Sequence, residues 1–184
     1  MWFVMDKQRG ENYQIVISEA QLRQRIALLG RQISQDFQGR ELLCVGVLEN
    51  GFAFVADLVR QLTCSVRCQW VTPRMHEIFD HNIATTEIFY TPEIDVAGHH
   101  VLLCEGILST GQTTDFLFRT FQARGAASIS VCSLLDRPSD RRVDLHVAYY
   151  GFRVGPQWLA GFGLGAPALD RNLPFIFAPP RVQA

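Results

Sequence analysis

Residues 101–114 read Val-Leu-Leu-Cys-Glu-Gly-Ile-Leu-Ser-Thr-Gly-Gln-Thr-Thr. The first four residues form a continuous apolar run, which is typical of a strand buried on both faces of a sheet. Residues 105–111 are expected to turn, and residues 112–124 to form a helix. A buried strand that passes through a short loop into a helix is the repeating unit of a parallel α/β sheet.

The loop of this unit predicts a phosphate site. Hydroxyl donors come from Ser109, Thr110, Thr113 and Thr114, and Gly111 lets the backbone approach a ligand closely. The helix that begins at Gln112 adds unpaired N–H groups and the positive end of its dipole. From spacing alone one alternative stays open, which is an ordinary helix start rich in Ser and Thr.

Outward from this unit, helices and strands alternate along the chain. Ser18 and Gln21 have the spacing of a capping box at a helix start. Residues 72–93 are expected to form a functional or mobile loop or hairpin. We predict helices at 19–37, 52–62 and 112–124, and strands at 42–48, 65–71, 101–104, 127–135 and 144–151. This alternation favours a mostly parallel sheet with helices on its faces.

Composition narrows the class of protein. A chain of 184 residues has the size of one domain, and 48% hydrophobic residues are enough to fill its core. A net charge of −1 gives no general attraction to nucleic acid or to an anionic membrane. No apolar run is long enough to span a bilayer, and no secretory signal is recognised. Three of the five cysteines lie in apolar runs, and reduced thiols fit a cytoplasmic protein.

No metal site is predicted from the residue pattern. Cys64 and Cys68 have a spacing that suits zinc, but no second Cys/His pair follows at zinc-finger spacing.

The chain resembles the hypoxanthine-guanine phosphoribosyltransferases, members of the type I phosphoribosyltransferase fold. Matching segments occur in order along nearly the whole chain, at 17–19, 43–48, 94–98, 134–138, 150–152, 161–164 and 171–174. The resemblance implies one domain over 1–184, with a core of about 38–150 and a small hood from about 1–17 and 152–184. It also implies transfer of a phosphoribosyl group from phosphoribosyl pyrophosphate (PRPP) to hypoxanthine or guanine, with magnesium.

The family signature for PRPP is only partly kept at 105–113. Glu105 keeps the first of two acids that hold the ribose hydroxyls, and Gly106 replaces the second. Ser109 replaces the Asp that acts as general base in the family. The resemblance leaves the cradle of the 5′-phosphate in place, which here comprises Ser109, Thr110, Gly111, Gln112 and Thr113.

The pyrophosphate and metal positions of the family are altered. The family's Leu-Lys-Gly turn reads Leu48-Glu49-Asn50, so a carboxylate replaces a cation. Gly165 replaces an Asp that binds magnesium in the family. The Ser-Tyr pair of the family's flexible loop is missing from 72–92, where Met75-His76 falls near its place. Magnesium is thus implied by the resemblance, although most of its ligands are lost.

The purine pocket of the family is better kept. Trp158 stands where an aromatic residue stacks on the base, with Leu159 beside it. Arg137 replaces the Lys that donates to the purine 6-oxo group and remains a cation and a donor. Arg171 matches a family Arg near the pyrophosphate.

We therefore expect a protein that binds a purine nucleotide or a related phosphorylated ligand, with catalysis weak or lost and a regulatory or partner-binding role. One alternative is an active enzyme that makes IMP or GMP in purine salvage, with Glu49 or Asp115 holding metal. Another is an interaction module without a small ligand, which would use the aromatic residues of 1–4 or 79–90 to bind another protein. The resemblance further implies a homo-oligomer, a dimer or a tetramer.

Overall fold

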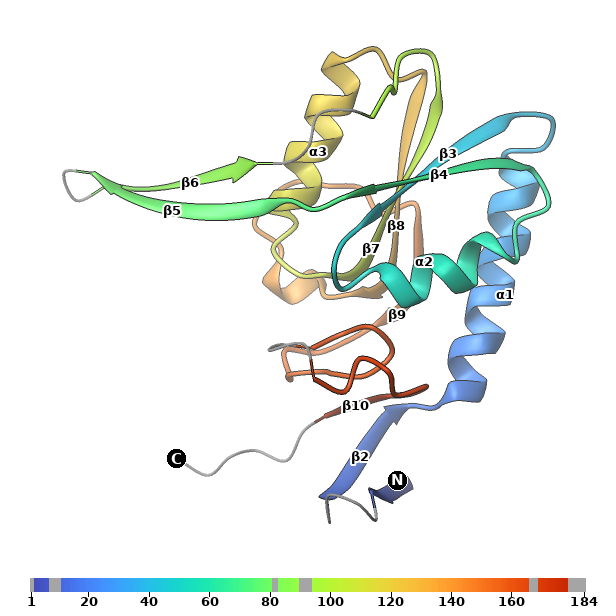
Figure 1. The fold of residues 1–184 in the computed structure, drawn as a ribbon, viewed down its shortest axis with the longest axis vertical. Helices are drawn as coiled ribbons and strands as arrows, with labels where there is room; N and C mark the ends of the chain where they lie inside the picture. The colour runs from blue at the N-terminus through green and yellow to red at the C-terminus, as the bar shows by residue number, and fades with distance from the viewer. Residues whose placement is uncertain (1, 7–10, 81–82, 90–93, 166–168, 179–184) are drawn as a thin grey trace.

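The core of the fold is a five-stranded parallel sheet (Figure 1). The computed structural model describes residues 2–6, 11–80, 83–89, 94–165 and 169–178, and the side chains of 14–73, 94–165 and 169–178. In spatial order the strands of the sheet are β4 (Ser65–Val71), β3 (Glu41–Val47), β7 (His100–Leu108), β8 (Ser128–Asp136) and β9 (Tyr149–Arg153). All four neighbouring pairs run parallel, as the alternation of strands and helices predicts.

Helices cover both faces of this sheet (Figure 1). The helices α1 (Glu19–Asp36) and α2 (Phe52–Val59) pack on one face, and α3 (Gln112–Ala123) packs on the other. In β3, Cys44 belongs to the cluster under α1 and α2, whereas Val45 belongs to the cluster under α3. This alternation is why the central strands are apolar without a break. The predicted capping box of Ser18 and Gln21 is confirmed at the start of α1.

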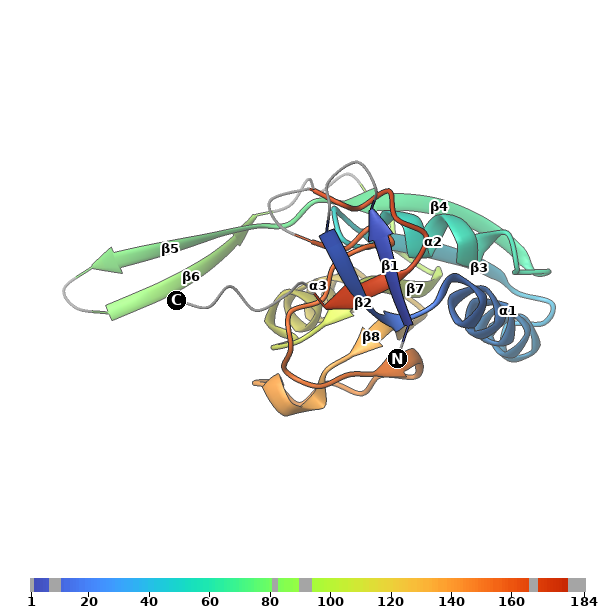
Figure 2. The same ribbon diagram turned by 90° about the horizontal axis from the view of Figure 1, so that it is seen from below.

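A second, antiparallel sheet is built from the two ends of the chain. It contains β1 (Trp2–Asp6), β2 (Glu11–Ile17) and β10 (Ile176–Ala178) and lies beyond the carboxyl ends of the parallel strands (Figure 1). A hairpin of β5 (Arg74–Asp80) and β6 (Ile83–Phe89) continues from β4 and extends away from the body (Figures 1 and 2). The segment expected to be a loop or hairpin is therefore a hairpin.

Three predicted boundaries are wrong. The strand expected at 101–104 continues to Leu108, because the segment expected to turn pairs with β8 as far as Asp136. The strand expected at 144–151 begins only at Tyr149, since its partners on β8 are Cys132 to Asp136. The helix expected at 52–62 ends at Val59.

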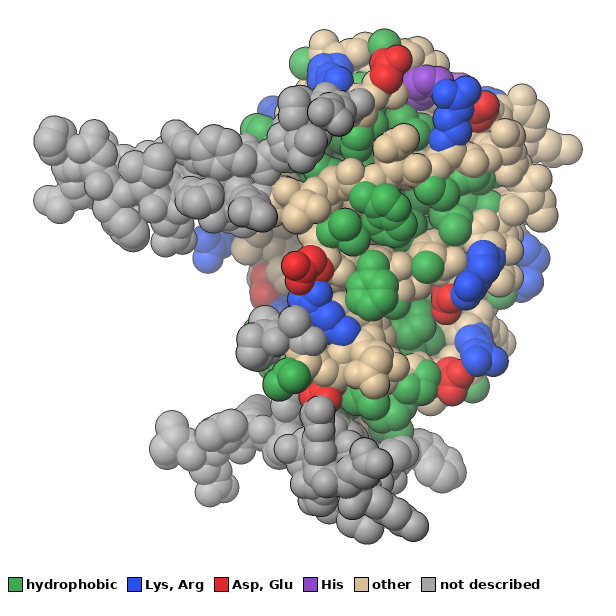
Figure 3. Space-filling view, in the orientation of Figure 1, with side chains coloured by type: hydrophobic (Ala, Val, Ile, Leu, Met, Phe, Trp, Pro, Cys, Tyr) green, Lys and Arg blue, Asp and Glu red, His purple; other side chains and the backbone are tan. Residues whose placement is uncertain are grey.

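Part of the surface is apolar. Exposed hydrophobic side chains gather over α2 and β4 on the face seen in Figure 3, and they include Phe52 and Trp70. Within the described part of the chain, no helix combines the length and the apolar character that a membrane span requires.

Candidate functional site

A cavity of about 260 Å³ opens where β3 and β7 end and α3 begins. In open parallel sheets this edge is the usual place for a ligand. Its lining comes from three segments far apart in the sequence, namely Val47, Leu48, Asn50, Pro73, Glu105, Ile107, Leu108, Ser109, Thr110, Gly111, Thr113 and Thr114. The structure thus brings most of the predicted phosphate-binding residues together, although Gln112 is not part of the described lining.

The turn into α3 depends on a glycine. Gly111 is the N-cap of α3 and has a φ of 79°, in the left-handed region that side chains disfavour. A Cβ atom there would lie 2.9 Å from Cδ of Arg141 and 2.9 Å from Cγ2 of Val143. The N-cap residue is therefore neither Ser nor Thr, although Oγ1 of Thr110 lies 3.5 Å from the backbone N–H of Gln112. The helix begins in the cavity wall without a side-chain cap.

Glu105 is a buried carboxyl group in the wall of this cavity. Its residue is 8% exposed, and its Oε1 atom accepts a hydrogen bond of 2.7 Å from Oγ1 of Thr114. Burial raises the pKa of Glu105 to about 7, against the smaller opposing effect of the Thr114 hydroxyl. The group is thus poised between its neutral and charged forms near neutral pH.

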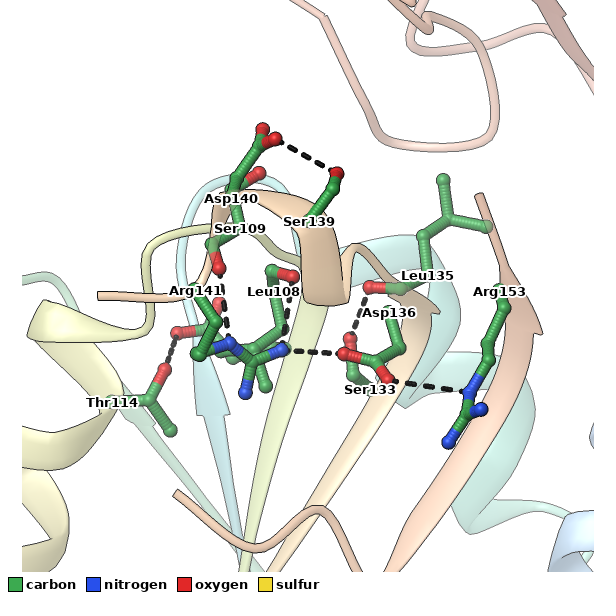
Figure 4. Close-up of polar contacts among 11 residues, drawn as sticks. Leu108, Ser109, Thr114, Ser133, Leu135, Asp136, Ser139, Asp140, Arg141 and Arg153 are labelled. Atoms are coloured by element: carbon green, nitrogen blue, oxygen red, sulfur yellow. Dashed lines mark hydrogen bonds and ion pairs between the residues drawn. The ribbon is translucent and has the colours of Figure 1, made fainter. Parts of the chain in front are cut away.

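Behind the turn 109–113 lies an arginine that the sequence analysis did not single out (Figure 4). Nε of Arg141 donates to the carbonyl of Ser109 at 3.1 Å, and Nη2 lies 3.5 Å from the carbonyl of Leu108. The same Nη2 donates to Oδ1 of the buried Asp136 at 2.5 Å. The next residue, Arg142, donates its backbone N–H to the carbonyl of Thr110 at 3.0 Å. These contacts bind three successive carbonyl groups of the turn, those of Leu108, Ser109 and Thr110, to the segment after β8.

The turn at 48–50 forms another wall of the cavity. The peptide bond between Leu48 and Glu49 is cis. Oε2 of Glu49 accepts a hydrogen bond of 2.7 Å from Nη1 of Arg171. Nε and Nη2 of Arg171 donate to the carbonyl of Gly165 at 3.1 and 2.9 Å, and Nη2 also lies 3.4 Å from Oδ1 of Asn50. Arg171 therefore contacts the turn at 48–50, but its guanidinium is already paired with the carboxylate of Glu49.

Gly106 and Asn50 are in close contact. A Cβ atom at position 106 would lie 2.1 Å from the backbone carbonyl oxygen of Asn50. The turn at 48–50 therefore occupies the space that an acidic side chain at 106 would need. The glycine at 106 and the asparagine at 50, both departures from the family pattern, are thus linked by one steric contact.

The predicted purine-binding residues lie apart from the described cavity lining. Nη2 of Arg137 donates to the carbonyl of Gln157 at 2.7 Å, so the segment 157–159 adjoins this arginine. Trp158 is 58% exposed, and Leu159 is buried. Nε of Arg137 is buried and has no hydrogen-bond partner within the described part of the chain.

In and beside the described cavity, the carboxylates that could meet the magnesium implied by the family resemblance are Glu105 and, in the turn at 48–50, Glu49. Within the described residues, no three side chains of His, Cys, Asp or Glu are grouped so that they could hold a metal ion. Asp115 forms an ion pair of 2.8 Å with Arg119 on the same helix. Glu105 is the one carboxylate in the described cavity lining. The side chains of Met75 and His76 lie outside the part that the structure describes, as do those of the aromatic residues in 1–4 and 79–90.

Comparison with known proteins shows the family. Residues 17–166 match the model of the phosphoribosyl transferase domain. The hypoxanthine phosphoribosyltransferase of Haemophilus influenzae is 33% identical over 88% of this chain and 92% of its own length. The hypoxanthine phosphoribosyltransferase of Escherichia coli is 31% identical over 89% of this chain and 93% of its own length. The chain therefore belongs to the hypoxanthine-guanine phosphoribosyltransferase family.

Solved structures agree with this assignment. A hypoxanthine-guanine phosphoribosyltransferase from Bacillus anthracis has a TM-score of 0.82 and 30% identity, and the match covers 91% of this chain and 98% of that one. A hypoxanthine phosphoribosyltransferase from Staphylococcus aureus has a TM-score of 0.85 and 25% identity. The match covers 97% of this chain and 98% of that one. The expected type I phosphoribosyltransferase fold is confirmed.

The sequence analysis missed three residues of the site. Thr114 was named only as one of the hydroxyl donors near the turn. Its hydrogen-bond partner Glu105 lies nine positions earlier in the sequence, on β7. Asp136 is the last residue of β8 and Arg141 follows the strand, and the acid–arginine spacing is the signal that was available. Nothing in the sequence alone tells that their contact reaches back to the turn before α3.

Proposed function

We propose that this protein binds a purine nucleoside 5′-monophosphate, or a related phosphorylated ligand, and has weak or no phosphoribosyl transfer activity. The phosphate would lie at the turn 109–113, the ribose near Glu105, and the purine near Arg137 and Trp158. The observation that carries the proposal is the beginning of α3 at Gly111, which faces a cavity lined with hydroxyl groups.

The geometry at Arg137 supports the purine part of this proposal. A buried donor without a partner costs about 1–3 kcal/mol. The Nε–H of Arg137 is such a donor, and a ligand carbonyl would satisfy it. A 6-oxopurine offers a carbonyl of this kind. Trp158 lies two residues before the buried Ala160. Its exposed aromatic ring is available to stack on a purine base.

The proposal of weak catalysis rests on the groups that the reaction requires. Ribosyl transfer needs proton transfer to or from the base, and general acid–base help is worth about 10²–10⁴-fold. Ser109 stands where the family has a carboxylate base, and a serine hydroxyl is a poor proton acceptor at neutral pH. Charge neutralisation on the leaving pyrophosphate is worth roughly another 10²–10³-fold per donor. Here Glu49 stands where the family has a cation, and it pairs with Arg171, so this turn offers no unpaired positive charge to a leaving pyrophosphate.

The family assignment favours a second candidate, which is an active purine phosphoribosyltransferase. The curated relatives at about 30% identity are described as hypoxanthine phosphoribosyltransferases. Glu105 would hold the ribose in such an enzyme, as it would in the nucleotide-binding protein. The two candidates differ in turnover and not in fold.

Calorimetric titration with IMP and GMP tests the binding proposal. Binding at micromolar ligand is expected for the wild type. The variant Thr110→Val keeps the size of the side chain but removes a hydroxyl from the cavity, and it should weaken binding about tenfold. A matched control is Thr120→Val, because the Thr120 hydroxyl bonds within α3, away from the cavity. A folded wild-type protein that binds neither nucleotide would contradict the proposal.

A further inference from the structure

The strand β4 forms one edge of the parallel sheet and is unusually exposed for such a strand. Strands of a parallel sheet are normally buried on both faces, and an edge is usually protected because its free backbone groups pair readily with another chain. At the opposite edge, Arg25 donates hydrogen bonds to the carbonyls of Tyr150 and Gly151 on β9. Among the described residues, no side chain contacts the backbone of β4 in this way. The exposed residues of this open edge are Ser65, Arg67, Cys68, Gln69 and Trp70.

Trp70 is held in a fixed position on this strand. Its neighbour on β3 is Gly46, where a Cβ atom would lie 2.5 Å from Cζ3 and 2.6 Å from Cε3 of the Trp70 ring. The same Cβ atom would lie 3.3 Å from Cγ2 of Val55 on α2. The ring therefore packs on the backbone of β3 beside α2, yet Trp70 is 42% exposed. A large ring that is ordered before association loses little entropy in a complex, which suits it to the centre of an interface.

A hollow of about 530 Å³ lies at the start of the same helix. Its apolar lining comprises Phe52, Ala53, Phe162, Leu173 and Pro174. Phe52 is 41% exposed and is one of the hydrophobic residues of the face seen in Figure 3. An apolar hollow of this size is large enough to hold an aromatic side chain. We refer to β4, α2 and this hollow together as the β4–α2 surface.

The charged side chains on β4 and at α2 are paired within the chain. Nε of Arg67 lies 2.8 Å from Oε1 of Glu41, and Asp57 pairs with Arg60. Paired charges give no attraction to nucleic acid or to an acidic peptide, and two copies of such a surface do not repel each other. A single added strand would cover the edge of β4 but neither α2 nor the hollow. A second copy of this chain is wide enough to cover all three.

We propose that two copies of this chain associate through the β4–α2 surface, with Trp70 of each copy in the hollow beside Phe52 of the other. The inference goes beyond the proposed function and does not depend on it. Each contact occurs twice in such a dimer, because both copies use the same surface. The arrangement buries the two aromatic residues that a single chain leaves exposed on this face. It also supports the turn at 48–50, since the N–H of Phe52 donates to the carbonyl of Glu49 at 3.4 Å.

Sedimentation velocity of the full chain over a range of protein concentrations tests the inference. The wild type is expected to sediment as a dimer. Trp70→Glu should weaken the dimer at least about thirtyfold, because it replaces the central aromatic residue of the contact with a carboxylate. Trp158→Glu is the matched control, since Trp158 is 58% exposed and adjoins Arg137 after β8, away from β4. The control should leave the dimer unchanged.

Alkylation of Cys68 by iodoacetamide is a second test, and it needs no substitution. The thiol of Cys68 is exposed on β4, so a dimer through this surface shields it. In the wild type, Cys68 should lose most of its reactivity as the protein concentration rises from the monomer range into the dimer range. A wild type that stays monomeric would overturn the inference and leave this surface to a different partner. A dimer in which Cys68 stays reactive, or which Trp70→Glu and Trp158→Glu affect equally, would also overturn it.

Discussion

At the scale of single residues, Glu105 is the group whose environment most changes its chemistry. It is buried at the end of β7, and burial raises its pKa to about 7. The sequence shows an acid before a glycine, which looks like the start of a turn. The pairing of Glu105 with Ser133 on β8 places it within the sheet instead. Its pKa could not be foreseen because burial is a property of the fold.

Glu105 should make the protein less stable as the pH rises. Between its ordinary pKa of 4.5 and its folded value of about 7, the native state keeps a proton that the unfolded chain releases. The free energy of unfolding therefore falls through this window, by about 3 kcal/mol in total. In Glu105→Gln this loss should disappear. Urea unfolding at pH 5 and pH 8 measures it, and Glu41→Gln should behave as the wild type. Equal pH dependence in the Glu105→Gln variant and the wild type would contradict the burial argument.

Gly111 should tolerate no side chain. Gly111→Ala places a Cβ in the left-handed region and 2.9 Å from the side chains of Arg141 and Val143. Gly125→Ala is the matched control, because its φ of 83° is similar but nothing lies within 4 Å. We expect the control to cost about 1 kcal/mol from the backbone alone. Gly111→Ala should cost about 2–4 kcal/mol and abolish nucleotide binding. Denaturant unfolding and calorimetry measure the two effects, and equal costs would show that crowding at Gly111 is unimportant.

At the scale of elements, the turn before α3 is supported by the segment after β8. Arg141 lies between the carbonyls of the turn and the carboxylate of Asp136, which is 5% exposed (Figure 4). A second arginine, Arg153 on β9, has its Nε 3.9 Å from the same carboxylate. The turn before α3 is therefore held by the segment after β8, and the arginine that holds it is paired with the last residue of β8.

Arg141→Met should destabilise the protein and weaken nucleotide binding together. Among the described residues, it leaves the buried Asp136 with only the distant Arg153 as an ion-pair partner, and breaking a buried pair costs about 3–5 kcal/mol. Arg142→Met, at an exposed neighbour, should change stability by less than about 0.5 kcal/mol. Chemical denaturation compares the two variants. Recovery of part of the stability in Arg141→Met combined with Asp136→Asn would confirm that the unpaired charge is the cause.

Most elements could be predicted from the sequence because their signals are local. Apolar runs marked the buried strands, and Ser18 with Gln21 marked the start of α1. The errors lie where pairing decides the boundary. Asp144 to Val147 alternate between polar and apolar residues, yet β8 offers them no partner. A local pattern cannot show which strand lies alongside.

At the scale of the whole molecule, the site depends on contacts between distant parts of the chain. Glu49 and Arg171 are 122 positions apart, and Arg137 and Gln157 are 20 apart. Resemblance to the family pointed singly to Glu49, Arg171 and Arg137. The sequence could not reveal that Glu49 neutralises Arg171, or that Asn50 excludes a side chain at position 106. The first requires knowledge of how the carboxyl-terminal segment packs on the parallel sheet, and the second requires knowledge that β3 and β7 are neighbours.

The central claim is that nucleotide binding persists here while phosphoribosyl transfer is weak. The most direct measurement is the rate at which the purified protein forms IMP from hypoxanthine and PRPP in the presence of magnesium. The account predicts a rate at the level of the reaction without protein, from the same preparation that binds IMP by calorimetry. Turnover of roughly 1 s⁻¹ or faster, which is ordinary for an enzyme, would contradict it.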